Sequence, residues 1–231
     1  MALPIIVLFD LDGTLIDTAP AIVLAMNQLL GRRGRPPVDL AKVRSLLSYG
    51  ASELLTGCLA SIPGEMDSDL SQFRSIYGSL RPDAADVYPG VRETLGWLVQ
   101  NGVRLGICTN KPQGLADAVL EGVGLRSFLS VVIGGDSVRH PKPHPDHLQE
   151  ALDRLGSSAR QAVYVGDSEI DSAAAKAACV PFVFVRYGYP IGDPDKVECA
   201  ARIDGLGGLP DILLQLANRP PRDPRTERFN W

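Results

Sequence analysis

The sequence predicts an α/β protein in which a parallel sheet lies between two layers of helices and carries an inserted block of helices. The apolar, mostly β-branched run at residues 5–9 stops at Asp10, as a fully buried parallel strand does. From residue 91 onward, strand-like and helix-like segments alternate, which is typical of a parallel sheet covered on both faces. Residues 19–80 show helical periodicity alone, so these helices interrupt the α/β core.

Four helices are expected in the inserted block. Pro20 suits the first turn of the first helix, and Asp39 can cap the second. Breaks rich in glycine, proline or serine separate the helices. The expected helices cover residues 19–30, 39–47, 51–60 and 67–80, with breaks at residues 31–37, 48–50 and 61–64. An extended return over residues 87–90 then leads back to the sheet.

The core is expected to alternate helix and strand to its end. Helices are expected over residues 91–101, 113–122, 145–155 and 169–178, and strands over residues 103–109, 129–134, 161–165 and 181–185. Ile203 is expected to begin a short last strand, followed by a helix over residues 208–216. We assign residues 1–17 and 88–217 to the core, residues 18–87 to the insertion and residues 218–231 to a Pro/Arg-rich tail, either a frayed terminus or a docking segment.

Composition and charge exclude several classes of protein. The hydrophobic content of 45% and charged content of 22% describe an ordinary globular protein of 231 residues. A net charge of −4 argues against a general nucleic-acid binder. The four cysteines are scattered without a CxxC pair, which predicts free thiols in a reducing compartment. Residues 5–8 are too short for a signal peptide or membrane span, so we expect a cytoplasmic protein without a membrane partner. We also expect the protein to be a monomer or a homodimer.

Asp10 and Asp12 are the first candidates for chemistry. A buried strand that ends at Asp10 delivers carboxylates to the edge of the sheet where α/β proteins bind ligands. Gly13 indicates a turn directly after them. Carboxylates packed together repel one another and lose hydration, so they require a compensating cation. Because Mg²⁺ prefers hard oxygen ligands, it is the cofactor that we expect.

Two further motifs carry candidate residues: Thr109 with Asn110 in one, and Lys142 in the other. The hydroxyl of Thr109 and the amide of Asn110 follow the next core strand, where such groups hydrogen-bond phosphate oxygens. Taken alone, this pair is explained more simply as a helix cap. Lys142 lies between two prolines that stiffen its backbone. An ammonium held rigidly in this way can neutralise a carboxylate and a phosphoryl group together.

Asp167 and Asp171 are the fourth pair of candidates. An apolar segment ends at Gly166–Asp167, and Asp171 follows about one helical turn later, so both carboxylates can face one cation from a helix N-terminus. We expect Asp167 to bind the metal directly and Asp171 to orient a metal-bound water or Lys142. Glu169 is expected to face solvent or cap the helix. His144 and His147 are expected to be structural.

These four motifs resemble the signature of the haloacid dehalogenase-like hydrolase superfamily. The resemblance rests on their order, on the position of each at a strand end or in the loop beyond it, and on the helices inserted after the first. The segments concerned read D-L-D-G-T-L-I-D at residues 10–17, T-N at 109–110, K-P-H-P at 142–145 and G-D-S-E-I-D at 166–171. The resemblance implies a Rossmann-like three-layer α/β/α core with a C1-type helical cap.

The resemblance also implies an activity, that of a Mg²⁺-dependent phosphatase acting through an aspartyl-phosphate. In that family the residue at Asp10 is the nucleophile, and the residue at Asp12 protonates the leaving alcohol and then activates water. The implied metal ligands are Asp10, the backbone carbonyl of Asp12 and Asp167. Thr109 and Asn110 are implied to position the phosphate, and Lys142 to neutralise it.

Three further segments resemble the phosphoglycolate phosphatase branch, which makes 2-phosphoglycolate the expected substrate. They lie at residues 17–20, 109–112 and 188–189. Residues 48–50 depart from that branch, because they read Ser-Tyr-Gly where a Gly-x-Gly turn is usual. Tyr49 is expected to narrow the substrate pocket or contact the substrate through its hydroxyl, with packing between cap helices as the alternative. Arg44 is expected to meet a substrate carboxylate or to lie on a solvated face, the latter being favoured.

Other functions stay open. Asp12 argues against a haloacid dehalogenase, which lacks that residue, and Lys42 lies in the wrong context for a phosphonoacetaldehyde hydrolase. A phosphatase or phosphomutase acting on a sugar phosphate would keep the same core, as would hydrolysis of a nucleoside monophosphate or of pyrophosphate. A non-catalytic binding or regulatory module is the alternative of another class. It is argued against by the presence of four charged residues together, which are Asp10, Asp12, Lys142 and Asp167.

Overall fold

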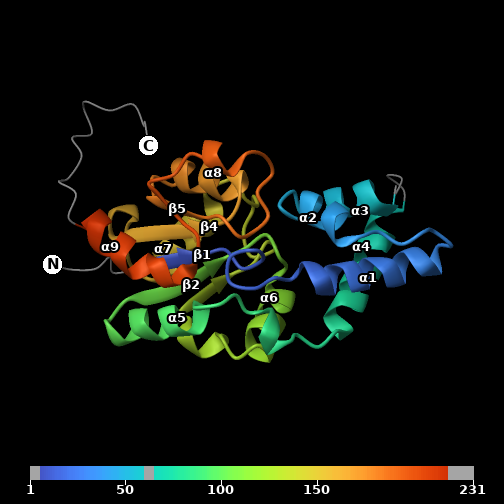
Figure 1. Cartoon of the computed structure of the whole chain (residues 1–231), viewed down its shortest axis with the longest axis horizontal. Helices are drawn as coiled ribbons and strands as arrows, with labels where there is room; N and C mark the ends of the chain where they lie inside the picture. Colours follow the sequence, from blue (N-terminus) through green and yellow to red (C-terminus); the bar gives the residue numbers. More distant parts are fainter. Residues whose placement is uncertain (1–5, 60–64, 218–231) are drawn as a thin grey trace.

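The computed structural model describes residues 6–59 and 65–217. Figure 1 shows a sheet with its covering helices at one end of the molecule and a block of four helices, α1 to α4, at the other. The Pro/Arg-rich tail expected at residues 218–231 and the break expected at residues 61–64 lie outside the described residues. The fold class predicted from the sequence, a parallel α/β sheet with an inserted helical block, is confirmed.

The described sheet has six strands, all parallel, in the order β3-β2-β1-β4-β5-β6. β1 lies at the centre, where Phe9 is paired with Ile107 of β2 on one side and Val165 of β4 on the other. Because all strands run the same way, their carboxyl ends meet at one edge. The strands are β1 (Ile6–Phe9), β2 (Arg104–Cys108), β3 (Val131–Ile133), β4 (Ala162–Gly166), β5 (Phe182–Val185) and β6 (Ala201–Ile203).

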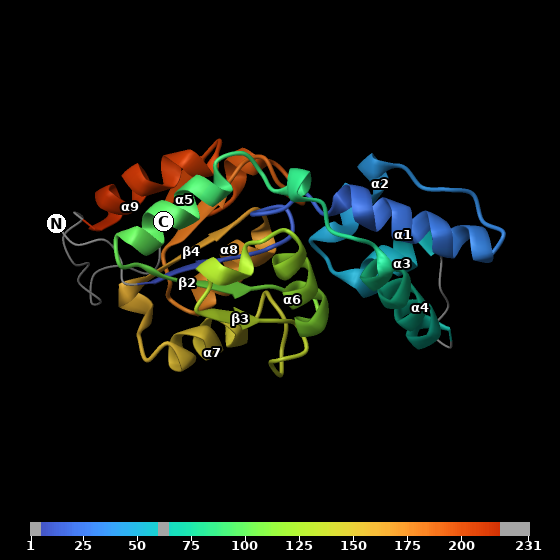
Figure 2. The same cartoon turned by 90° about the horizontal axis from the view of Figure 1, so that it is seen from below.

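Helices cover both faces of the sheet because side chains of each strand point alternately to opposite faces. Val7 and Phe9 pack with α5 (Val91–Gln100), α6 (Gln113–Gly122) and α9 (Leu209–Ala217), whereas Ile6 and Leu8 pack with α7 (Asp146–Arg154) and α8 (Glu169–Ala177). Figure 2 shows α5 and α9 on one side of the sheet and α7 on the other. Burial of both faces explains the uninterrupted apolar runs in the sequence.

The inserted block consists of α1 (Ala19–Arg32), α2 (Leu40–Leu47), α3 (Ala51–Leu59) and α4 (Met66–Ser79). Apolar side chains of α1, such as Met26 and Leu29, are fully buried among those of the other three helices. The cap expected at Asp39 is confirmed, because its carboxylate accepts a hydrogen bond from the backbone N–H of Lys42 at 2.8 Å. Pro20 lies in the first turn of α1, as its fixed φ favours.

Two chain segments that run side by side connect the insertion to the sheet. Asp17 donates its backbone N–H to Asp86 at 2.8 Å, and Tyr88 donates to Leu15 at 3.0 Å. An antiparallel bridge between Ile16 and Val87 lies between these bonds. The connection leaves the core directly after Asp10–Gly13, so the insertion adjoins the carboxyl edge of the sheet.

β3 and β6 differ most from their expected limits. β3 is shorter than the expected residues 129–134, because a short 3₁₀ turn at Arg126–Phe128 precedes it and delays strand pairing. Ile203 ends the last strand, whereas the sequence predicted that it would begin there. Pairing starts earlier because Ala200 already donates its backbone N–H to Phe182 of the neighbouring strand, at 2.8 Å. Among the described residues, no helix is long and apolar enough to cross a membrane.

Candidate active site

Three neighbouring strands bring polar side chains to one point of the carboxyl edge. Asp10 follows β1, Thr109 follows β2 and Asp167 follows β4. Because β1 lies between the other two strands, these residues converge at the centre of the sheet. Carboxylate oxygens of Asp10, Asp167 and Asp171 all lie within 4.8 Å of one another, and the three residues are buried.

Lys142 supplies the positive charge in this cluster. Its ammonium lies 2.8 Å from Asp10 Oδ1 and 2.7 Å from Asp171 Oδ1, and its side chain is 2% exposed. It also donates to the hydroxyl of Tyr164 at 3.0 Å. Burial alone would lower the pKa of Lys142, but the two carboxylates outweigh it and hold that pKa above its ordinary value. The lysine is therefore charged where it meets Asp10.

Asp171 has both carboxylate oxygens occupied by the protein. Tyr164 Oη donates to Oδ1 at 2.8 Å, where Lys142 also binds, and Ser168 Oγ donates to Oδ2 at 2.6 Å. Ser168 is also the N-cap of α8, and its backbone N–H donates to Asp171 in a reciprocal capping box. Asp171 consequently orients Lys142, the arrangement that its expected indirect role requires.

Asp167 faces the cluster from the start of the loop after β4. Its Oδ1 accepts from Thr14 Oγ1 at 2.9 Å, and its Oδ2 accepts from the backbone N–H of Tyr189 at 2.6 Å. The backbone approaches closely here, because a Cβ on Gly13, which has φ +82°, would lie 2.2 Å from Asp167 Oδ2. A Cβ on Gly188 would lie 2.3 Å from the same oxygen. The two glycines thus let the chain close around this carboxylate.

The three carboxylates carry more negative charge than Lys142 balances. Burial and the neighbouring carboxylates raise the pKa of Asp10 to about 7, although Lys142 opposes the shift. Burial and the charges of Asp171 and Asp10 likewise raise the pKa of Asp167 well above its usual range. A divalent cation that takes oxygen ligands would remove this repulsion. The donor set of Asp10 and Asp167 therefore fits such an ion.

Asp12 is paired with a lysine of its own. Lys111 Nζ donates to both carboxylate oxygens of Asp12, at 2.8 and 2.9 Å, and lies 4.7 Å from the ring centroid of Tyr77. The Lys111 side chain is 6% exposed. Lys111 lies within residues 109–112, a segment that resembles the phosphoglycolate phosphatase branch, but the sequence patterns assigned it no role. The available signal was its position directly after the two phosphate-binding candidates.

Thr109 and Asn110 differ in what they offer to a ligand. The Thr109 hydroxyl accepts from the backbone N–H of Lys111 at 3.2 Å, which leaves its hydrogen for donation. The Asn110 amide accepts from Lys142 N–H at 2.9 Å and donates to the Lys142 carbonyl at 3.0 Å. The side chain of Asn110 therefore fixes the backbone of the lysine loop through its oxygen and one amide N–H, and its second amide N–H is left for the predicted contact with phosphate.

A cleft lies between the carboxyl edge and the inserted helices. Its core side includes all the predicted motif residues except Asp171, and its other side comes from α1, α2, α3 and α4 and the turn after α2. Tyr49 does not line it: this side chain is 45% exposed, and its neighbours Ser48 and Gly50 form the wall instead. From the insertion, Arg74 of α4 lines the cleft, and within the described part of the chain it has no hydrogen-bond or ion-pair partner.

Contacts between the insertion and the core hold the cleft in its present shape. Arg44 Nη2 lies 2.6 Å from Asp17 Oδ2, and its guanidinium carbon lies 5.8 Å from the ring centroid of Tyr189. Ser48 Oγ donates to the Tyr189 carbonyl at 2.6 Å. The ion pair of Arg44 was not expected, but its side chain is 43% exposed, in agreement with the favoured expectation of a solvated residue. Glu169, expected to face solvent or cap a helix, accepts from backbone N–H groups at residues 191 and 192 and so anchors the same loop.

His147 lies behind the lysine loop, on α7, with its side chain fully buried. Burial and the charge of Lys142 lower the pKa of this imidazole from 6.5 to about 4. In the unfolded chain the ring titrates at its ordinary pKa, so between these two values the unfolded state binds more protons. The free energy of unfolding contributed by this group therefore falls as the pH falls through that window, by up to about 3 kcal/mol.

His147→Leu is expected to remove this loss of stability at low pH. Urea unfolding at about pH 7 and about pH 4.5 measures the free energy of unfolding of each protein, and its pH dependence should be weaker in the variant. His140→Gln is the control, since its side chain is 49% exposed and should leave most of the dependence in place. An unchanged pH dependence in His147→Leu would contradict the assignment of a buried neutral imidazole.

The chain is similar to a family of known hydrolases. Residues 7–185 match the model of the haloacid dehalogenase-like hydrolase family. The chain is 40% identical over 220 residues to a phosphoglycolate phosphatase of Rhodospirillum rubrum, with 91% of each protein covered. It is 40% identical over 204 residues to a phosphoglycolate phosphatase of Xanthomonas campestris pv. campestris, which covers 88% of this chain and 92% of the relative.

Solved structures agree with this similarity. A predicted phosphoglycolate phosphatase from Haemophilus somnus has a TM-score of 0.83 at 28% identity, over 90% of this chain and 97% of that one. A haloacid dehalogenase-superfamily hydrolase of subfamily IA from Geobacter sulfurreducens has a TM-score of 0.70 at 31% identity, over 90% of this chain and 95% of that one. The similarity thus extends over the core and the inserted helices alike.

Proposed function

The chain belongs to the haloacid dehalogenase-like hydrolase family and is a phosphatase, and we propose that it hydrolyses 2-phosphoglycolate to glycolate and phosphate with Mg²⁺ as cofactor. One observation carries the proposal. Asp10 contacts the charged Lys142 in a buried cluster, while Asp12 is paired with Lys111. Two neighbouring carboxylates in such different surroundings suit a nucleophile and an acid/base. The relatives named for phosphoglycolate support the substrate.

In the proposed mechanism, Mg²⁺ would be held by Asp10, Asp167 and the backbone carbonyl of Asp12, and would supply positive charge beside the transferring phosphoryl group. Lys142 neutralises charge on Asp10 and the phosphate, and the Thr109 hydroxyl donates to a phosphate oxygen. An Asp10 oxygen attacks phosphorus in line and displaces the alcohol oxygen, which Asp12 protonates. Asp12 then takes a proton from water, which attacks the aspartyl-phosphate and regenerates the Asp10 carboxylate.

We propose that the inserted helices act as a cap over this chemistry. The domain division is that expected from the sequence, with residues 18–87 as the cap and residues 1–17 and 88–217 as the core. The cleft between them and the paired connecting segments support this division. Closure of the cap would exclude bulk water from the aspartyl-phosphate. The four free cysteines support a reducing compartment, the cytoplasm.

Arg74 is the group that we propose to recognise the substrate's carboxylate. Phosphoglycolate carries a phosphate at one end and a carboxylate at the other, so a second cation is needed across the cleft from Lys142. Arg74 enters the cleft from α4, and the described residues leave its guanidinium unpaired. A guanidinium binds a carboxylate through two parallel hydrogen bonds, which a lysine at that position would not reproduce.

Arg74→Gln is expected to lower kcat/KM for 2-phosphoglycolate by about 10- to 100-fold, mainly through KM, because a charged hydrogen-bond partner is lost. Turnover of p-nitrophenyl phosphate, which has no carboxylate, should change little. The measurement is phosphate release in Mg²⁺ and in chelator, with Arg32→Gln as an exposed control on α1.

Phosphate release from 2-phosphoglycolate, p-nitrophenyl phosphate, sugar phosphates and nucleoside monophosphates separates the possible outcomes. Equal losses on both esters would show that Arg74 acts through the fold of the insertion and not through the carboxylate. A preference for sugar phosphates or nucleoside monophosphates would keep the chemistry and change the substrate. If no ester released phosphate in Mg²⁺, the proposed activity would be wrong, and a phosphomutase or a binding module would have to be considered.

A further inference from the structure

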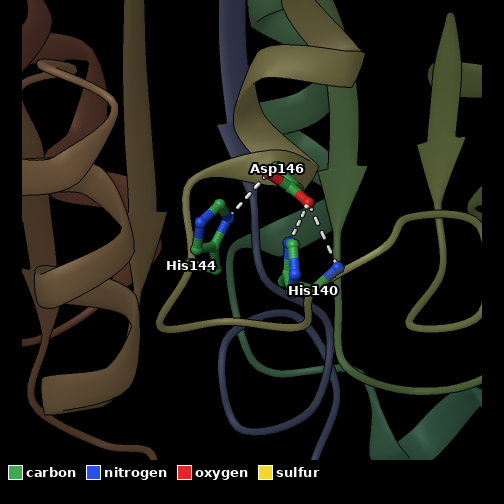
Figure 3. Close-up of side chains that lie close together, drawn as sticks. All are labelled: His140, His144 and Asp146. Carbon is green, nitrogen blue, oxygen red and sulfur yellow. Dashed lines mark hydrogen bonds and ion pairs between the residues drawn. The ribbon is translucent and has the colours of Figure 1, made fainter.

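A second group of metal-binding side chains lies on the loop that carries Lys142. His140 and His144 flank that lysine, and Asp146 is the first residue of α7. Figure 3 shows both imidazole rings turned toward the two oxygens of one carboxylate. His140 Nδ1 lies 3.0 Å from Asp146 Oδ2, and His144 Nδ1 lies 2.6 Å from Asp146 Oδ1.

The carboxylate at the centre of this group is held independently of the rings. The backbone N–H of His140 donates to Asp146 Oδ2 at 3.1 Å. The two imidazole rings lie against each other, with centroids 4.5 Å apart. Two imidazoles and one carboxylate therefore lie together on this loop, with their donor atoms within 4.8 Å of one another.

The donor set differs from that of the active site. Two imidazole nitrogens and one carboxylate are the ligands of borderline ions such as Zn²⁺, whereas the three buried aspartates suit Mg²⁺. Tetrahedral zinc places its ligand atoms about 3.3 Å apart, slightly wider than the present Nδ1–oxygen distances. The His140 and His144 side chains are 49% and 48% exposed, so both have room to make this small adjustment. Each Nδ1 proton would be replaced by the ion, and a water would take the fourth position.

We propose that His140, His144 and Asp146 form a second cation site, specific for Zn²⁺ or a similar transition-metal ion and separate from the catalytic carboxylates. The ion would tie residues 140 and 144 to the start of α7, and so close the loop on both sides of Lys142. Asn110 already fixes the Lys142 backbone from the core side, through its N–H and its carbonyl. The bound ion would therefore stabilise this loop from its solvent side. This inference does not rest on the proposed substrate.

The test is titration of the whole protein with Zn²⁺ by calorimetry, in excess Mg²⁺ to occupy the carboxylate site. We expect one Zn²⁺ per chain, and a rise in Tm of about 4 °C or more once the site is well saturated. Co²⁺ in place of Zn²⁺ should give the visible absorption of a tetrahedral site. The double variant His140→Gln/His144→Gln should bind Zn²⁺ at least about 10-fold more weakly and lose both signals.

Two controls make the result decisive. Glu150→Gln changes an exposed carboxylate on the same helix, paired with Arg154, and should bind Zn²⁺ like the unaltered protein. Glu150→Gln and the double variant His140→Gln/His144→Gln should both keep Mg²⁺-dependent phosphatase activity measured without zinc. This readout distinguishes failure of the zinc site from failure of the proposed function. Equal zinc isotherms for the unaltered protein and the double variant would overturn the proposal. So would zinc binding that disappears when Mg²⁺ is added.

Discussion

Asp10→Asn is expected to lower kcat for phosphate release by on the order of 10⁴-fold or more, because an amide oxygen cannot form the aspartyl-phosphate. The fold should persist. The substitution is nearly isosteric and removes one charge from a cluster in which burial raises the pKa of Asp10 to about 7. Lys142 keeps its second partner, Asp171, at 2.7 Å. In chelator, the variant should therefore be at least as stable as the unaltered protein.

Activity and stability are measured on the same samples, by phosphate release and by thermal unfolding with and without Mg²⁺. Asp204→Asn is the matched control, since that carboxylate is 92% exposed and should leave both quantities unchanged. Activity of Asp10→Asn close to that of the unaltered protein would exclude Asp10 as the nucleophile. A large loss of stability in chelator would instead show that the carboxylate is needed structurally.

Lys142→Met is expected to reduce kcat by on the order of 10³-fold and also to destabilise the protein. The substitution leaves Asp10 and Asp171 buried without their ammonium, and breaking a buried pair of this kind costs about 3–5 kcal/mol. The cost should be smaller in Mg²⁺ than in chelator, because the cation compensates part of the same charge. Denaturant unfolding in both conditions measures the difference.

Two comparisons isolate the buried charge. Lys176→Met removes a lysine that pairs with Glu198 on the surface and is 44% exposed, and it should change the free energy of unfolding only slightly. The double variant Asp10→Asn/Lys142→Met should recover part of the lost stability, because it removes one of the stranded carboxylates. A Lys142→Met protein as stable in chelator as the unaltered one would show that the cluster does not need this ammonium.

The fold class and the edge of the sheet that carries the candidate site were predictable from the sequence. Alternation of apolar strands and helices predicts a parallel sheet, and such a sheet places its strand ends at one edge. Asp10, Thr109 and Asp167 were therefore placed at this edge from local signals, each as the first polar residue after an apolar run, and the resemblance of the motifs gave them their predicted roles. The cap at Asp39 was found the same way. In all these cases the physical cause lies within a few residues.

Which side chains meet around the cleft depends on the tertiary structure. Lys111 pairs with Asp12, 99 positions away in the chain, and no local pattern reports that contact. The sequence assigned Tyr49 to the pocket, but the helical insertion turns it outward and presents Arg74 of another helix instead. The amide of Asn110 also fixes the lysine loop, a contact that its position after a strand did not suggest. Such outcomes depend on how packed elements orient their side chains, which strand and helix periodicity leaves open.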